Sequence, residues 1–138
     1  MSRAPSTAGI LLLAVVLAAC GRGRGQALGD LRFFPGATVV GTAAFVGEAH
    51  GFPRALWEQV ELRSQARYEQ VRAFYQTLQI AGWTSAFESE SRKSDGRLYT
   101  RYLVDGRRQR FYVVVVEERQ RTGDVAIVLR RGRGEHRP

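Results

Sequence analysis

Cysteine and histidine are scarce in this chain of 138 residues, and each shortage excludes a kind of chemistry. Cys20 is the single cysteine, so no internal disulfide can form. His50, beside Glu48, and His136 are the only histidines, and neither has enough ligand-type neighbours for a zinc site. A Ser-His-acid triad also lacks support, because no Gly-x-Ser-x-Gly turn occurs and His50 has no partner serine.

Other catalytic patterns are weak. Glu88 and Glu90 share one face of a predicted strand, and paired carboxylates of this kind serve glycoside hydrolysis. With Arg92 and Lys93 nearby, the pair is more typical of a solvated strand face. The glycine run Gly21–Gly25 has no strand before it and no helix after it, as a phosphate-binding loop requires. We therefore expect no enzymatic activity, no metal and no cofactor.

An apolar run near the N-terminus ends at the cysteine. Ala8–Ala19 carries no charge and follows Arg3, which is the layout of a signal peptide. The run is shorter than the roughly 20 residues that a membrane-spanning helix needs. The sequence Leu17–Cys20 (LAAC) resembles the lipobox of bacterial lipoproteins. The resemblance implies cleavage before Cys20, diacylglycerol on its thiol and acylation of the new amino group. The alternatives are a secretory signal with a coincidental cysteine and an uncleaved anchor.

These features predict the subcellular localisation and the domain organisation. We expect a lipid-anchored protein of the cell membrane or outer membrane, facing the periplasm or the exterior. Residues 1–19 would be the signal peptide, 20–30 the lipidated Cys20 and a glycine-rich tether, 31–130 a single domain, and 131–138 a basic disordered tail. A lipidated Cys20 would leave no thiol for catalysis or metal binding.

The charge is strongly positive. The formal net charge is +8, and Lys93 is the only lysine, so nearly all the basic residues are arginines. An exported basic protein is suited to anionic lipid, acidic glycans or another envelope protein, and the export signal argues against nucleic acid. The candidates for contact with an anionic surface are Arg22, Arg24, Arg130, Arg131, Arg133 and Arg137. Solvated charge is the alternative for each.

Apolar periodicity predicts an α+β domain in which one helix packs on an antiparallel sheet. The predicted helix is Gln65–Ala81, with Ser64 as its N-cap and Gly82 at its end. Asp-Gly pairs between alternating segments predict hairpins. The expected order is β-β-α-β-β-β-β, with strands at Thr38–Val46, Ala55–Arg63, Trp83–Ser91, Arg97–Val104, Gln109–Glu118 and Val125–Arg130.

Two features address what covers the sheet. Phe111–Val116 is apolar on both faces, which predicts a central strand covered on both sides. The helix covers one face, and the other needs Phe33–Phe34, the first hairpin or another molecule. Tyr75 and Trp83 are expected in the core. Trp57, Tyr99 and Tyr112 are candidates for the second face.

The Pro35-Gly36-Ala37 sequence, predicted to form a type II turn, and Tyr68–Trp83 (YEQVRAFYQTLQIAGW) together resemble small exported bacterial domains of unknown function. In those domains a similar turn opens the fold, and a helix with this pattern precedes a β-meander. The resemblance implies a fold and a secreted setting, and it brings no catalytic residues.

The function expected from these observations is non-enzymatic. The chain would have a structural, accessory or binding role, in contact with another envelope component through the second sheet face or the basic tail. The alternative is a carrier or sensor of a small amphipathic ligand held between helix and sheet. A cavity above roughly 300 Å³ would support the alternative.

Overall fold

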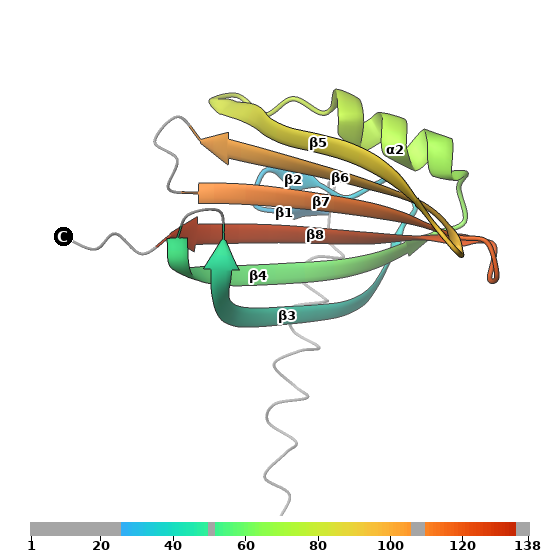
Figure 1. The fold of residues 1–138 in the computed structure, drawn as a ribbon, viewed down its shortest axis with the longest axis horizontal. Helices are drawn as coiled ribbons and strands as arrows, with labels where there is room; N and C mark the ends of the chain where they lie inside the picture. The colour runs from blue at the N-terminus through green and yellow to red at the C-terminus, as the bar shows by residue number, and fades with distance from the viewer. Residues whose placement is uncertain (1–25, 50–51, 106–109, 135–138) are drawn as a thin grey trace, which may run out of the picture.

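The computed structural model describes residues 26–49, 52–105 and 110–134 (Figure 1). A short hairpin, β1 and β2, precedes a six-stranded sheet, and one helix, α2, lies between the fourth and fifth strands of the chain. The bounds are β1 Ala27–Leu28, β2 Leu31–Arg32, β3 Thr38–Ala49, β4 Phe52–Ser64, α2 Tyr68–Thr77, β5 Trp83–Lys93, β6 Gly96–Asp105, β7 Arg110–Arg119 and β8 Asp124–Gly134.

The six-stranded sheet is antiparallel, and its strand order is β3-β4-β8-β7-β6-β5. Strands β5 to β8 form the predicted meander, and β4 pairs with β8 at its far side. The α+β class and the order β-β-α-β-β-β-β are confirmed. The strand predicted to be central is also confirmed, because β7 lies between β6 and β8.

The helix is shorter than predicted, and its start is different. It runs from Tyr68 to Thr77, with Arg67 at the N-cap. Ser64 cannot cap it, because Ser64 is the last residue of β4 and its hydroxyl accepts from the Ala66 amide. Gly82 has the predicted left-handed conformation (φ 83°), but it belongs to a turn beyond the helix, closed by the Trp83 amide on the Ile80 carbonyl.

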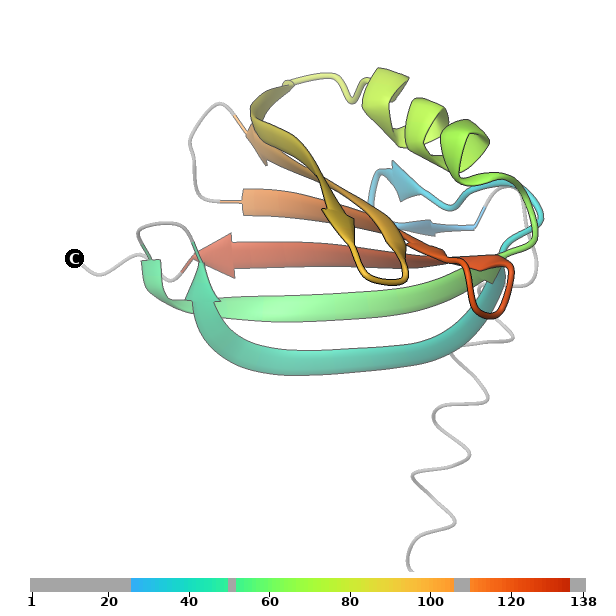
Figure 2. The ribbon, with the colours of Figure 1, turned by 45° about the vertical axis from the view of Figure 1, so that its right-hand side comes forward.

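The main core lies between the helix and one face of the sheet, here called the helix face. Tyr68, Val71 and Tyr75 are the buried residues of α2, spaced as the apolar stripe predicted. The hairpin adds Leu28 and Leu31 to the same core. Figure 2 shows α2 and the hairpin on the same side of the sheet. The sheet side of this core consists of Val60, Leu62, Tyr99, Leu103, Tyr112, Val114, Val116, Val125, Ile127 and Leu129.

The opposite face of the sheet, here called the second face, has its own smaller cluster of Ala55, Trp57, Phe111 and Val113. Of the three alternatives for its cover, Phe33–Phe34 is excluded, because both residues pack in the helix-face core. Of the aromatic residues expected there, Trp57 is present, whereas Tyr99 and Tyr112 belong to the helix face. Strand alternation decides this, since Tyr112 points opposite to Phe111.

Both predicted domain ends need correction. The tether was expected to extend to residue 30, but Ala27–Leu28 pairs with Leu31–Arg32, because burying Leu28 in the core stabilises a hairpin there. At the other end, β8 continues past Arg130, and Gly134 pairs with Ala55 of β4. Residues 131–134 therefore belong to the sheet rather than to a disordered tail.

Pro35-Gly36 forms the predicted turn, with φ 82° at Gly36 and a hydrogen bond of 3.0 Å from the Ala37 amide to the Phe34 carbonyl.

Candidate functional site

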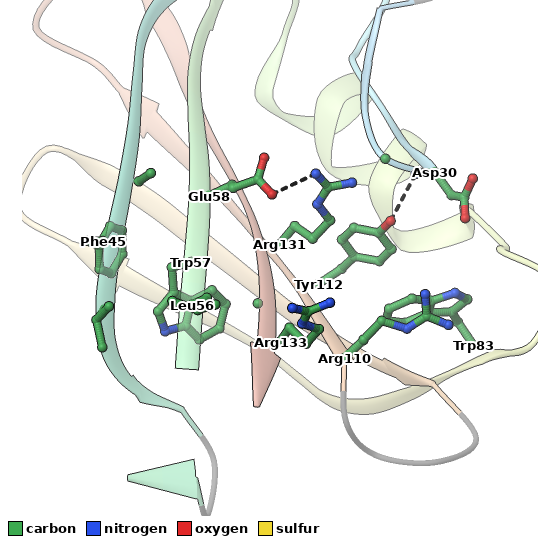
Figure 3. A pocket seen from close by; sticks show the side chains of 14 residues that line it. Asp30, Phe45, Leu56, Trp57, Glu58, Trp83, Arg110, Tyr112, Arg131 and Arg133 are labelled. Carbon is green, nitrogen blue, oxygen red and sulfur yellow. Dashed lines mark hydrogen bonds and ion pairs between the residues drawn. The ribbon is translucent and has the colours of Figure 1, made fainter. Parts of the chain in front are cut away.

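A hollow of about 810 Å³ lies beside the β1–β2 hairpin (Figure 3). Its walls come from the turn of that hairpin and from five strands of the large sheet. The lining residues are Gly29, Asp30, Ala44, Phe45, Val46, Leu56, Trp57, Glu58, Trp83, Arg110, Tyr112, Arg131, Gly132 and Arg133.

Register places eight of these residues in two parallel rows on the helix face. Each row crosses β3, β4, β8 and β7, and neighbouring strands stand about 4.8 Å apart. The inner row, next to the hairpin, is Ala44, Glu58, Arg131 and Tyr112. The outer row is Val46, Leu56, Arg133 and Arg110.

The polar side chains of the inner row already have partners within the protein. Arg131 Nη2 donates to Glu58 Oε1 at 2.7 Å, and this carboxylate raises the pKa of the Arg131 guanidinium. The Asp30 amide donates to the Tyr112 hydroxyl at 2.9 Å, which fixes the hairpin turn over the sheet. A Cβ at Gly29 would collide with Tyr112 and Arg131, and its φ of 60° also favours glycine. The hairpin therefore fits tightly over the inner row.

The outer row lies beyond the hairpin and is open to solvent. Val46 and Leu56 are 52% and 44% exposed, which is unusual for apolar residues on the face that carries the core. Arg133 is exposed, and no carboxylate of the described residues lies within ion-pair distance of it. The row is thus apolar at one end and cationic at the other.

Arg110 and Arg133 are directly opposite each other in the antiparallel register. Like charges at such a position destabilise a sheet unless another group offsets them. Arg110 Nε donates to Asp105 Oδ2 at 3.0 Å, yet its side chain remains 61% exposed. Arg110 and Arg133 both line the hollow, and Figure 3 shows the Arg110 side chain beside Trp83.

An aromatic pair forms the wall beside Arg110. The rings of Trp83 and Tyr112 are 4.3 Å apart between centroids, and the Arg110 guanidinium lies 5.8 Å from the Trp83 ring centroid. Trp83 was expected in the core. It is only partly buried, and it packs against the helix-face core from the rim of the hollow. Tyr75, in contrast, is fully buried as expected.

The structure separates the arginines that sequence analysis grouped together. Arg131 and Arg133 line the hollow, but Arg130 lies on the second face, where it donates to Gln59 at 2.7 Å and its guanidinium is 5.9 Å from the Phe45 ring centroid. Alternation along β8 causes this split. Cys20, Arg22, Arg24 and Arg137 lie outside the described residues.

The other candidate groups do not converge on the hollow. Glu90 accepts from the Tyr68 hydroxyl at 2.8 Å, and Glu88 accepts from the Tyr99 hydroxyl at 2.7 Å, so the pair joins edge strand β5 to the core. Burial, together with these bonds, raises the pKa of both tyrosines. His50 and His136 lie outside the described residues.

The described part of the chain contains neither a metal-binding cluster nor a membrane-spanning helix. Within it, His, Cys, Asp and Glu side chains form no cluster that could hold a metal ion. The helix of residues 68–77 is also too short to cross a bilayer, and the described residues contain no longer apolar helix.

No protein-family model, curated protein or solved structure gives a significant match to this chain.

Sequence analysis missed Val46, Leu56 and Arg110 as site residues. The alternation of Arg131 and Arg133 could have placed these two arginines on one face. Their neighbours depend on the register of β8 with β4 and β7, which are distant in sequence.

Proposed function

We propose that this chain is a lipid-anchored cell-envelope protein with a non-enzymatic binding role, and that the hollow holds a small amphipathic ligand. The observation that supports binding is the open hollow of about 810 Å³, whose outer row pairs exposed apolar residues with arginines. Pockets for small molecules have typical volumes of about 300–1,000 Å³.

The proposal places the ligand beside the hairpin rather than between helix and sheet. The space under α2 is filled by the main core, where Val71 and Tyr75 are fully buried. The second face offers a less suitable surface for a small ligand, because Trp57 fills the space over Gly132 and packs against Phe111. The hollow lies at the edge of the helix-face core, where apolar side chains of the sheet are exposed to solvent.

The proposed anchor rests on the LAAC sequence at Leu17–Cys20. Acyl chains on Cys20 would hold the protein at a membrane, since each buried methylene contributes about 0.8 kcal/mol and two chains suffice for stable anchoring. Mass spectrometry of the native protein should find Cys20 as the first residue, carrying acyl chains. Cys20→Ala should leave the uncut precursor, and a mature N-terminus elsewhere with a free thiol would overturn the anchor.

Binding has its own test, which does not depend on the anchor. The chain from residue 20 onward, with Cys20→Ser, is titrated with decanoate, decanol and decyltrimethylammonium below their micelle concentrations. Since Trp83 and Trp57 both line the hollow, we expect at least one of these amphiphiles to change tryptophan emission saturably, and Trp83→Phe should reduce that change. If none binds, the hollow is not an amphiphile site.

A further inference from the structure

We infer that the ligand of the hollow is an anionic amphiphile, with a phosphate or carboxylate head on Arg133 and Arg110 and an apolar chain over Leu56 and Val46. This inference rests on the proposed binding function and specifies the ligand. The order of the outer row carries it: two apolar side chains and then two arginines, side by side across four strands.

The arginines supply the charge preference. A guanidinium presents several N–H donors in a plane, a shape that matches the paired oxygens of carboxylate and phosphate. Arg110 Nε donates to the Asp105 carboxylate, and Arg133 has no carboxylate partner among the described residues. Asp105 offsets part of the Arg110 charge, so Arg133 carries most of the attraction for an anionic head. A cationic head would be repelled by Arg133.

The carboxylates of the hollow do not cancel this preference. Glu58 is paired with Arg131 in the inner row. Asp30 is in the hairpin turn, where its amide donates to the Tyr112 hydroxyl. Asp105 pairs with Arg110 and offsets part of its charge, whereas Arg133 has no ion pair with a described carboxylate. The end of the hollow farthest from the hairpin thus has two guanidinium groups in the outer row.

The apolar half explains why the ligand needs a chain as well as a head. Leu56 is the register partner of Arg133, and Val46 is the partner of Leu56, so an apolar chain would lie beside the head at a spacing of about 4.8 Å per strand. Covering these two side chains removes apolar surface from water. Inorganic phosphate alone gains nothing from this part of the row.

The proposed anchor points to the membrane as the source of such a molecule. Residues 21–25 separate Cys20 from Gln26, so the domain begins within roughly 20 Å of the lipidated residue even at full extension. Gly29 and Asp30, which line the hollow, follow shortly after. The hollow is therefore held close to the lipid surface.

The test uses the chain from residue 20 onward with Cys20→Ser, after cooperative unfolding has been verified for each variant. Isothermal titration with decyl phosphate and decanoate is compared with decanol, decyltrimethylammonium and inorganic phosphate. We expect both anionic amphiphiles to bind at least about tenfold more tightly than the other probes. Arg133→Gln should weaken decyl phosphate about tenfold. Arg130→Gln, which removes the same charge from the other face of β8, should change its affinity less than twofold.

Each other outcome has one meaning. If decanol or decyltrimethylammonium binds as tightly as decanoate, the anionic preference is wrong, while binding in the hollow stands. If inorganic phosphate binds as tightly as decyl phosphate, the site recognises a free anion, and the amphiphile is wrong. Equal effects of Arg133→Gln and Arg130→Gln would overturn the assigned head position. If no probe binds, the proposed function itself fails.

Discussion

Arg101, which is buried on β6, caps the C-terminus of the helix that carries Tyr75. Its Nη1 donates to the Tyr75 carbonyl oxygen at 2.5 Å and to the Leu78 carbonyl oxygen at 2.8 Å. Carbonyl groups at a helix C-terminus have no partner within the helix, and a cation there is favoured by the helix dipole. The guanidinium thus joins α2 to the sheet and satisfies two backbone acceptors at once.

Replacing Arg101 should therefore destabilise the fold. Arg101→Met keeps the apolar stem but removes both hydrogen bonds, and we expect a loss of about 2 kcal/mol in the free energy of unfolding. Arg92→Met on β5 is the control, since Arg92 is exposed, and it should change stability by less than about 0.5 kcal/mol. Urea denaturation measures both. Equal losses would mean that Arg101 does not cap the helix.

The Tyr75 hydroxyl should hold the hairpin segment against the helix. It donates to the Arg32 carbonyl at 3.0 Å and accepts from the Phe34 amide at 2.9 Å. Tyr75→Phe leaves both backbone groups without this partner, and we expect it to cost about 1–3 kcal/mol. Hydrogen exchange at the Phe34 amide should accelerate relative to amides of β7. An unchanged Phe34 exchange rate would contradict this role.

Stability should fall in alkaline solution. Burial raises the pKa of Tyr75 above its ordinary value, and the pKa values of Tyr68 and Tyr99 are raised by burial and by their bonds to Glu90 and Glu88. In the unfolded chain these groups lose protons near pH 10, so the folded state binds more protons above that pH. The stabilisation is complete below pH 10 and is lost as the pH rises further.

Denaturation midpoints between pH 8 and pH 11.5 measure this loss. Tyr75→Phe should flatten the decline, because one of the three titrating groups is gone. A decline equally steep in the variant would show that Tyr75 does not contribute.

Gly132 should be irreplaceable because Trp57 packs on it. A Cβ at Gly132 would lie 2.6–2.8 Å from carbons of the Trp57 ring. Gly132→Ala should therefore displace the indole and cost about 1–3 kcal/mol, with a shift in tryptophan emission. Gly41→Ala is the matched control, because a Cβ there would lie 3.9 Å from the Glu61 carboxylate, an ordinary contact distance. Similar losses for both variants would contradict the close packing.

Local patterns in the sequence predicted the fold well. Alternating residues predicted the strands, the stripe of Tyr68, Val71 and Tyr75 predicted the helix, and Pro35-Gly36 predicted the turn. These signals are local, because each depends on neighbours within a few residues. Both errors at the domain ends concerned segments stabilised by distant partners. Leu28 is buried by the core, and Gly134 pairs with Ala55 of β4.

The site was less predictable for the same reason. The arginines at 131 and 133 were recognised as basic, but the sequence did not indicate that Leu56 lies beside Arg133 or that Arg110 lies opposite it. A row across a sheet combines residues from separate strands, and only the register brings them together.

The most direct measurement of the central claim is where an anionic amphiphile touches the sheet. Backbone amide shifts of the isotopically labelled chain from residue 20 onward, with Cys20→Ser, are followed during titration with decanoate, and decanol serves as the uncharged comparison. The account predicts that decanoate moves the amides of Leu56, Arg110 and Arg133 most, with smaller changes for decanol at Arg110 and Arg133. Largest shifts at Val113 and Val115 on the second face, or at Val71 and Tyr75 in the helix, would contradict it.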